Sequence, residues 1–183
     1  IKDAITLAYG NELRDKLAQC HMYSAMEFLM FENEYGKFIA DSIKAFLKNN
    51  KLQIDFIASH GHTIFHQPDK GFTCQIGSGA VISAITGIVT ISDFRTLDVA
   101  LGGQGAPLVP IGDEMLFSDY DYCLNLGGFA NVSYEKSYSR IAFDICPVNI
   151  FINYMMQKNG KEYDMDGETA RSGKIIPLFL DEL

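Results

Sequence analysis

Two carboxylates and one guanidinium lie close together in Ser92–Asp98, directly after the apolar run Ile88–Ile91. A carboxylate beside a reacting carbon can accept a proton from water, which would suit Asp93 or Asp98. Arg95 can hold a carboxylate, of the protein or of a substrate, through two parallel hydrogen bonds. The alternative is an ion pair that only stabilises the loop, and these residues alone leave both interpretations open.

Polar side chains also follow the apolar run Ile54–Ser59. Ligand sites of open α/β sheets lie at the carboxyl ends of strands, so His60 and Thr63 are placed to hydrogen-bond a sugar hydroxyl or acetamido group. Because His60, His62 and His66 share one parity, an extended chain would also put them on one face, as a zinc site requires. The loop contains no acidic ligand, which weighs against zinc; polar residues that simply end a strand are the third interpretation.

The segment Leu101–Pro110 contains three glycines and two prolines in ten residues. Glycine permits a positive φ or the close approach of a ligand. A plain linker would be more polar. We therefore interpret this segment as the lip of a cleft that leads into a connecting helix.

A possible phosphate site lies in Leu124–Val132, where an apolar strand runs into Gly127 and Gly128 and a second strand follows. Backbone N–H groups at such a turn can cradle phosphate oxygens, although an ordinary hairpin also fits. Asp144 ends the next predicted strand, before a helix expected to start at Pro147. Its carboxylate could reach a magnesium ion or simply cap that helix.

Apolar periodicity and turn residues place these segments on strands and helices. The predicted helices are 11–18, capped by Asn11, 27–49, 78–86, one ending near 117, and 147–159; the predicted strands are 54–59, 63–66, 72–76, 88–91, 122–126, 129–134 and 140–144. The strands 54–59 and 88–91 are expected to be buried. From about residue 120 the predicted strands form hairpins, and this change of pattern predicts a second α/β domain. We therefore expect residues 1–116 to be part of a first domain that ends in a connecting helix, and 117–183 to begin a second.

Composition restricts the classes of partner. The formal net charge of −8 disfavours binding to nucleic acid or to an anionic membrane, although a nucleotide can still bind through local donors and a metal ion. The four cysteines are widely spaced and fit reduced, buried thiols of a cytoplasmic protein. The sequence shows neither a membrane span nor a signal peptide. It begins without Met and ends in an apolar run, which suggests a segment of a longer chain.

Several segments together resemble one family: SHGHTIFHQP, QIG, SDFRTLDVALGGQGAPLVP, LNLGGFANVSY and FDICPVNIFINY occur in the order and spacing of anhydro-N-acetylmuramic acid kinases. The resemblance covers nearly the whole chain from about Ala8. It implies an α/β, actin-like ATPase (ribonuclease H-like) two-domain fold, present here in part. It also implies that ATP, with Mg²⁺, and a small amino sugar meet between a sugar-binding first domain and a nucleotide-binding second domain.

The implied activity is hydrolysis of the 1,6-anhydro bond and phosphorylation of O6, giving N-acetylmuramic acid 6-phosphate in cell-wall recycling. In the family pattern the second acid of DFRxxD, here Asp98, is the general base, and LNLGG is a phosphate-binding hairpin. We expect five residues to bind the sugar or orient the water: His60, Thr63, Asp93, Arg95 and Gln104. We expect five to bind the nucleotide: Asn125, Gly127, Gly128, Asn131 and Asp144. No metal site made by protein ligands alone is expected.

The sequence also departs from the family pattern. Members commonly carry Gln where His62 stands, and many carry Thr-Gly-Pro-Gly where this chain has Ile145–Val148. One alternative is therefore a sugar- or nucleotide-binding homologue with altered catalysis. A histidine-ligated metalloprotein and a kinase of a free 6-hydroxyl are others. The glycine-rich GTSxDG-like loop of the family does not occur in this chain, so we expect little or no kinase activity from these residues alone. The sequence leaves open whether the protein is a homodimer.

Overall fold

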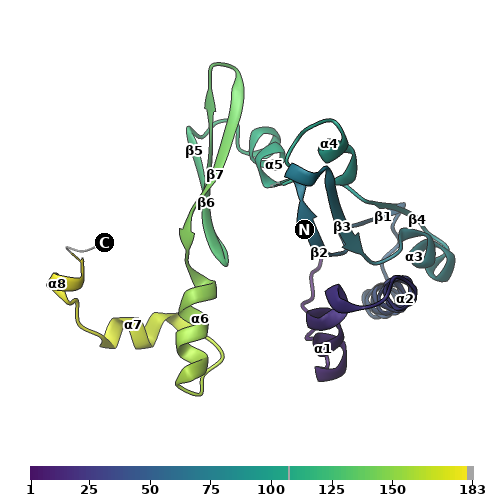
Figure 1. The fold of residues 1–183 in the computed structure, drawn as a ribbon, viewed down its shortest axis with the longest axis horizontal. Helices are drawn as coiled ribbons and strands as arrows, with labels where there is room; N and C mark the ends of the chain where they lie inside the picture. The colour runs from purple at the N-terminus through teal and green to yellow at the C-terminus, as the bar shows by residue number, and fades with distance from the viewer. Residues whose placement is uncertain (107, 181–183) are drawn as a thin grey trace. The chain divides into compact units, whose positions relative to one another are not determined.

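The computed structural model describes residues 1–106 and 108–180, which form a mixed α/β structure (Figure 1). Pro107 of the glycine-rich segment and residues 181–183 lie outside the described residues. The chain divides into two compact units, residues 1–106 and 107–183. The division falls before helix α5 (Val109–Leu116), whereas the sequence placed the domain boundary after residue 116, because α5 packs against strand β7 (Ser139–Pro147).

The first unit contains most of the elements that periodicity predicts, within a few residues. They are α1 (Asn11–Gln19), η1 (Cys20–Met22), α2 (Ala25–Asn50), β1 (Phe56–Ser59), β2 (His62–Gln67), η2 (Pro68–Lys70), β3 (Phe72–Ile76), α3 (Gly79–Thr86), β4 (Val89–Ser92) and α4 (Thr96–Ala100). Helix α4 was not predicted, because its five residues are too few to show a helical period. The prediction that Asn11 caps α1 is wrong: Gly10 is the N-cap, and Asn11 is the first helical residue.

The long helix α2 organises the core of the first unit. It begins at a capping box, in which the Ser24 hydroxyl accepts from the Glu27 backbone N–H and the Glu27 carboxylate accepts from the Ser24 N–H. Its buried residues Phe31 and Tyr35 pack with Ile76 of β3 in one cluster. The other cluster joins three residues of α2, β1 and α3: Ala40, Ile57 and Ile82. Helix α2 thereby supports both sheets of the unit.

Two small sheets carry the strands of the first unit. β1 and β4 pair in parallel, from Phe56↔Val89 to Ser59↔Ser92, whereas β2 and β3 form an antiparallel hairpin. The prediction that the run ending in β4 is a buried strand is wrong, since Val89 is 67% and Ile91 is 47% exposed. The parity argument for the histidines also fails, because Gly61 has a φ of +72° and the hairpin register shifts between Thr63 and Phe65.

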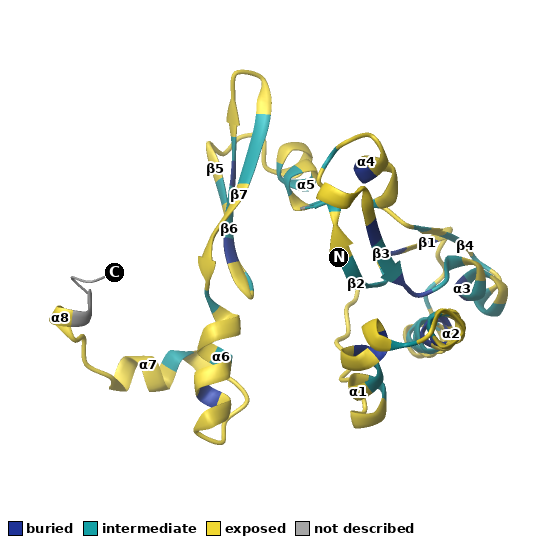
Figure 2. Cartoon of the chain, in the orientation of Figure 1, coloured by how far each residue is buried: buried dark blue, intermediate teal, exposed yellow. Residues whose placement is uncertain are grey.

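The second unit is a three-stranded antiparallel sheet with helices. Its elements are α5 (Val109–Leu116), β5 (Tyr122–Leu126), β6 (Phe129–Lys136), β7 (Ser139–Pro147), α6 (Asn149–Lys158), η3 (Met165–Gly167), α7 (Glu168–Ser172) and α8 (Pro177–Leu180), with strand order β5-β6-β7. Pro147 ends β7 instead of starting a helix, and α6 begins two residues later. The described residues of this unit that are buried are Ala130, Ser133 and Met156 (Figure 2).

No helix in the described part of the chain combines the length and the apolar character needed to span a lipid bilayer.

Candidate functional site

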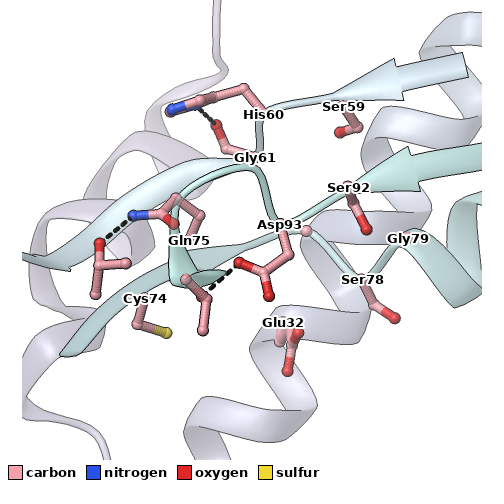
Figure 3. Close-up of a pocket in the computed structure, with 13 residues that line it drawn as sticks. Glu32, Ser59, His60, Gly61, Cys74, Gln75, Ser78, Gly79, Ser92 and Asp93 are labelled. Atoms are coloured by element: carbon pink, nitrogen blue, oxygen red, sulfur yellow. Dashed lines mark hydrogen bonds between the residues drawn. The ribbon is translucent and has the colours of Figure 1, made fainter. Parts of the chain in front are cut away.

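A polar cavity of about 210 Å³ lies at the carboxyl ends of β1 and β4 (Figure 3). The two strands run in parallel, and their last residues, Ser59 and Ser92, are register partners. The residues that follow, His60 and Asp93, therefore enter the same cavity from two strands. This is the position at which the sequence expected a ligand site.

The loop after β4 holds Asp93 in an uncommon conformation. Its φ is +60°, in the left-handed region that residues other than glycine rarely adopt. The hydroxyl of Thr96, in the first turn of α4, donates to the Asp93 Oδ1. This bond fixes the carboxylate at the cavity wall, where Figure 3 shows it. A sparsely populated backbone conformation at a cavity is consistent with a functional role.

The sequence did not predict several residues of the cavity, among them Glu32, which supplies its second carboxylate. Glu32 comes from α2, and in Figure 3 it lies below Asp93. Among the described residues its carboxylate makes no hydrogen bond or ion pair. Burial, followed by the charges of Glu32 and Asp93, raises the pKa of the nearby Cys74 thiol. No local pattern marks Glu32, because only the packing of α2 brings it to the loops after β1 and β4.

The amide of Gln75 adds a further unsatisfied group. Its Nε2 donates to the Thr73 hydroxyl at 2.7 Å, while its Oε1 is buried and has no partner among the described residues. Small residues crowd the same wall: a Cβ at Gly79 would overlap the Ser92 hydroxyl. The cavity therefore offers two carboxylates, several hydroxyls, an imidazole and an amide, and its lining contains no Lys or Arg.

Three of the predicted sugar-binding residues do not line this cavity. Thr63 lies on β2 opposite Gln75. Arg95 is the N-cap of α4, and its Nε is buried without a partner among the described residues. Gln104 is exposed in the glycine-rich segment. The structure thus brings together His60 and Asp93 of the predicted set and leaves these three outside.

Asp98, the predicted base, lies on α4 and also does not line the cavity. The residue is exposed, and its Oδ2 accepts a hydrogen bond of 2.6 Å from the backbone N–H of Gly105. An ion pair of Arg95 with Asp93 or Asp98, the alternative interpretation of this motif, is not among the contacts of the described residues.

In the second unit, three predicted nucleotide-binding residues form one row. Asn125 on β5 is the partner of Asn131 on β6, which in turn pairs with Asp144 on β7. Residues directly opposite each other in an antiparallel sheet project from the same face, so the two amides and the carboxylate share a face. Asp144 lies within β7 and is exposed, and Val148 is the N-cap of α6, so the interpretation of Asp144 as a helix cap is wrong.

The Gly127-Gly128 turn connects β5 and β6 as predicted and also holds the start of α6. The backbone N–H of Val148 donates to the Gly128 carbonyl at 2.8 Å, and that of Asn149 donates to the Gly127 carbonyl at 3.3 Å. Neither glycine has a positive φ, so the turn is not one of the tight hairpin types that require it. A Cβ at either glycine would meet no atom closer than 3.6 Å. Internal packing therefore does not explain the two glycines.

The described residues contain no group of three or more His, Cys, Asp or Glu side chains arranged to hold a metal ion. Burial, and secondarily the charge of His60, lowers the pKa of His62. The His62 ring packs edge-on against the ring of Tyr35, with centroids 6.1 Å apart.

Comparison with known proteins gives one consistent match. A family model described as anhydro-N-acetylmuramic acid kinase matches residues 3–183. The relative from Pseudomonas fluorescens is 42% identical over 160 residues, which is 83% of this chain and 44% of the relative. That from Photobacterium profundum is 38% identical over 162 residues, 83% of this chain and 43% of the relative. That from Aliivibrio fischeri is 44% identical over 137 residues, 71% of this chain and 37% of the relative.

All three relatives carry the name anhydro-N-acetylmuramic acid kinase. The chain spans less than half the length of each of them.

Proposed function

The chain belongs to the anhydro-N-acetylmuramic acid kinase family, and we propose that the full-length protein opens the 1,6-anhydro bond of anhydro-N-acetylmuramic acid and phosphorylates O6. The co-substrate is ATP, and the product is N-acetylmuramic acid 6-phosphate, an intermediate of cell-wall recycling in the cytoplasm. The fold of the whole protein is the actin-like, two-domain one. The first unit, residues 1–106, contributes to its sugar-binding domain, and the second unit, which contains α5, contributes to its nucleotide-binding domain.

The observation that carries this proposal is the polar cavity after β1 and β4. Its hydroxyls and its two carboxylates, Glu32 and Asp93, suit the O–H and N–H donors of an uncharged sugar ring and its acetamido group. The two negative charges, with no Lys or Arg in the lining, would repel the carboxylate of the lactyl group. That carboxylate therefore lies outside the cavity, where Arg95 is the cation of the same loop. Thr63 and Gln104 complete the proposed set of sugar contacts.

Asp98 acts as the general base in the proposed reaction. It takes a proton from a water molecule, whose oxygen forms a bond to the anomeric carbon while the bond from that carbon to O6 breaks. The electron pair left on O6 attacks the γ-phosphorus of ATP, and ADP departs with the bridging oxygen. O6 needs no proton, because it leaves carbon and bonds phosphorus in the same turnover. One carboxylate therefore replaces the acid and base pair of an ordinary glycosidase.

The row Asn125–Asn131–Asp144 and the Gly127-Gly128 turn are the proposed nucleotide contacts. Glycines that neither an unusual φ nor internal packing requires leave room for phosphate oxygens against the backbone. The exposed carboxylate of Asp144, beside an amide oxygen, fits the oxygen ligands that Mg²⁺ prefers. When bound, Mg²⁺ would offset the negative charge of the phosphates.

The test is the reaction of the full-length protein with ATP and anhydro-N-acetylmuramic acid in ¹⁸O-labelled water. We expect sugar 6-phosphate with ¹⁸O at the anomeric hydroxyl. Finished product incubated alone in labelled water measures the background exchange at that carbon and is the control. Absence of sugar phosphate would refute the proposal. Formation of product from the free sugar, with no label beyond background, would identify a kinase of a free 6-hydroxyl.

One observation favours a second candidate, a homologue that binds sugar and nucleotide without turnover. The segment Ile145–Val148 directly follows Asp144, and the family pattern that the sequence resembles implies Thr-Gly-Pro-Gly at these positions. Titration calorimetry that detects sugar and ATP binding in a protein without phosphate transfer would support this candidate.

A further inference from the structure

We propose that Gly103 and Gly105 position the Asp98 carboxylate, so that Oδ2 is anchored to the backbone and Oδ1 is the oxygen that accepts the proton from water. This inference rests on the proposed role of Asp98 as the base. It adds two positioning residues and assigns the reacting oxygen.

The chain folds back on Asp98 directly after α4. The backbone N–H of Gly103 donates to the Asp98 carbonyl at 2.8 Å. Two residues later, the N–H of Gly105 donates to the Asp98 Oδ2 at 2.6 Å. Asp98 is therefore held at its main chain and at its side chain by the same turn.

Gly103 lies against the carboxylate itself. A Cβ at this position would come within 2.5 Å of the Cγ and Oδ1 of Asp98, and closer still to its Oδ2. The φ of Gly103 is not positive, so its backbone conformation does not require glycine. The reason for glycine at position 103 is therefore the space that the carboxylate occupies. Because a side-chain end is easier to displace than backbone, an added methyl group would move the carboxylate and leave the fold intact.

Gly105 has a different role. Its φ is +64°, and a Cβ there would lie 2.6 Å from a methyl carbon of Val99 and 3.2 Å from the carbonyl oxygen of Arg95. Only glycine lets the backbone pass this close to α4, and this approach delivers the N–H that binds Oδ2. The position of the donor is thus set by the packing of the turn on the helix.

The two oxygens of Asp98 are consequently unequal. Oδ2 accepts from Gly105, whereas Oδ1 has no donor among the described residues. Asp98 is exposed, so Oδ1 is open to a water molecule or a substrate. A base must lie within about 0.5 Å of its productive position, and a shift of about 1 Å can reduce the rate about 100-fold. Anchoring one oxygen supplies that precision for the other.

The test compares Gly103→Ala with Gly102→Ala in the full-length protein. Gly102 has a φ of +89°, but a Cβ there would meet no atom within 4 Å. We expect Gly103→Ala to lower kcat about 10- to 100-fold, with the KM for ATP and the melting temperature unchanged. Gly102→Ala should instead lower the melting temperature and keep kcat, because it strains the backbone without touching Asp98. A normal kcat in Gly103→Ala would overturn the inference.

A double-mutant cycle with Asp98→Asn separates positioning from a general structural effect. If Gly103 acts through Asp98, Gly103→Ala adds no further loss of kcat in the Asp98→Asn background. Additive losses would assign Gly103 a merely structural role and overturn the inference. Near-normal turnover of Asp98→Asn alone would remove Asp98 as the base and the inference with it. A large loss in Asp98→Asn beside an unaffected Gly103→Ala would reject only the positioning.

Discussion

At the scale of single residues, the two carboxylates of the polar cavity differ in their hydrogen bonding. Glu32 and Asp93 reach one cavity from different elements, and Asp93 is held by Thr96 whereas Glu32 has no partner among the described residues. A ligand that displaces water from such a carboxylate costs solvation energy unless the ligand itself donates a hydrogen bond to it. The proposed sugar would supply such a donor, and hydrogen bonds to charged groups contribute about 1.5–3 kcal/mol.

We therefore expect Glu32→Ala in the full-length protein to raise the KM for the sugar about 10-fold or more, with the KM for ATP unchanged. The matched control is Glu34→Ala on the same helix, whose carboxylate lies 2.7 Å from the Lys16 Nζ at the surface. Exposed ion pairs contribute little, so this variant should keep both constants. Equal effects of the two substitutions would remove Glu32 from the sugar site.

His62 is expected to make the stability of the protein depend on pH. Burial and the charge of His60 lower the pKa of His62 below its ordinary value near 6.5. The unfolded chain therefore binds a proton at a higher pH than the folded chain does. Stability is unaffected above about pH 6.5 and falls as the pH drops from there towards the folded pKa.

We predict that His62→Gln, which replaces the imidazole by a group that does not titrate, reduces the loss of stability at acidic pH. Melting temperatures of both full-length proteins, measured from pH 7.5 to 5.0, would fall more steeply for the histidine protein. Parallel curves would mean that His62 does not contribute to the pH dependence.

At the scale of elements, a buried serine joins α5 to the sheet of the second unit. The Ser133 hydroxyl on β6, 3% exposed, donates to the Asp113 carboxylate on α5. It also accepts from the Arg140 guanidinium on β7 at 2.9 Å, and a further Arg140 N–H donates to the Cys123 sulfur. This network explains why α5 groups with the second unit, although the sequence predicted it as the connecting helix that ends the first domain.

Ser133→Ala should loosen α5, because Asp113 and Arg140 both lose a partner. Leaving such groups unsatisfied costs about 1–3 kcal/mol. Hydrogen–deuterium exchange of the full-length protein should show faster uptake over residues 109–116. The control is Ser139→Ala at the exposed start of β7, which should leave uptake unchanged. Unaltered protection of α5 in Ser133→Ala would contradict the role of the network.

The ends of helices and strands were predicted well where they depend on residues close by in the sequence. The helical period of α2 and the Gly87 that ends α3 are short-range features, and both helices begin and end within two residues of the predicted bounds. Local signals failed where a partner outside the segment decides the conformation. Pro147 continues β7 because it pairs with Phe129 on β6, and a helix start is then postponed.

At the scale of the whole molecule, the two units differ in how much apolar surface they bury. The first unit has two clusters of buried side chains. In the second, large side chains such as Leu124 (59%), Leu126 (60%) and Phe143 (50%) remain exposed on the strands. Exposed apolar surface on this scale marks a face that another segment or partner covers.

We expect residues 1–183 expressed alone to bind a hydrophobic dye and to transfer no phosphate from ATP, whereas the full-length protein transfers phosphate and binds little dye. The reason is that a sheet with few buried side chains gains too little from apolar burial to offset the conformational entropy of folding. Dye fluorescence and sugar phosphate formation, measured side by side, check this. An active, dye-free chain of 183 residues would contradict it.

The sequence by itself determined the family, the alternation of strands and helices, and the positions of His60 and Asp93 after two strands, because these depend on neighbours along the chain. Only the tertiary structure decided that β1 and β4 pair in parallel and so bring those two residues into one cavity with Glu32. It also placed Arg95, Gln104 and Asp98 outside that cavity and folded Gly103 and Gly105 against Asp98. The physical reason is that such contacts depend on how helices pack and loops fold back, which no short-range pattern of residues encodes.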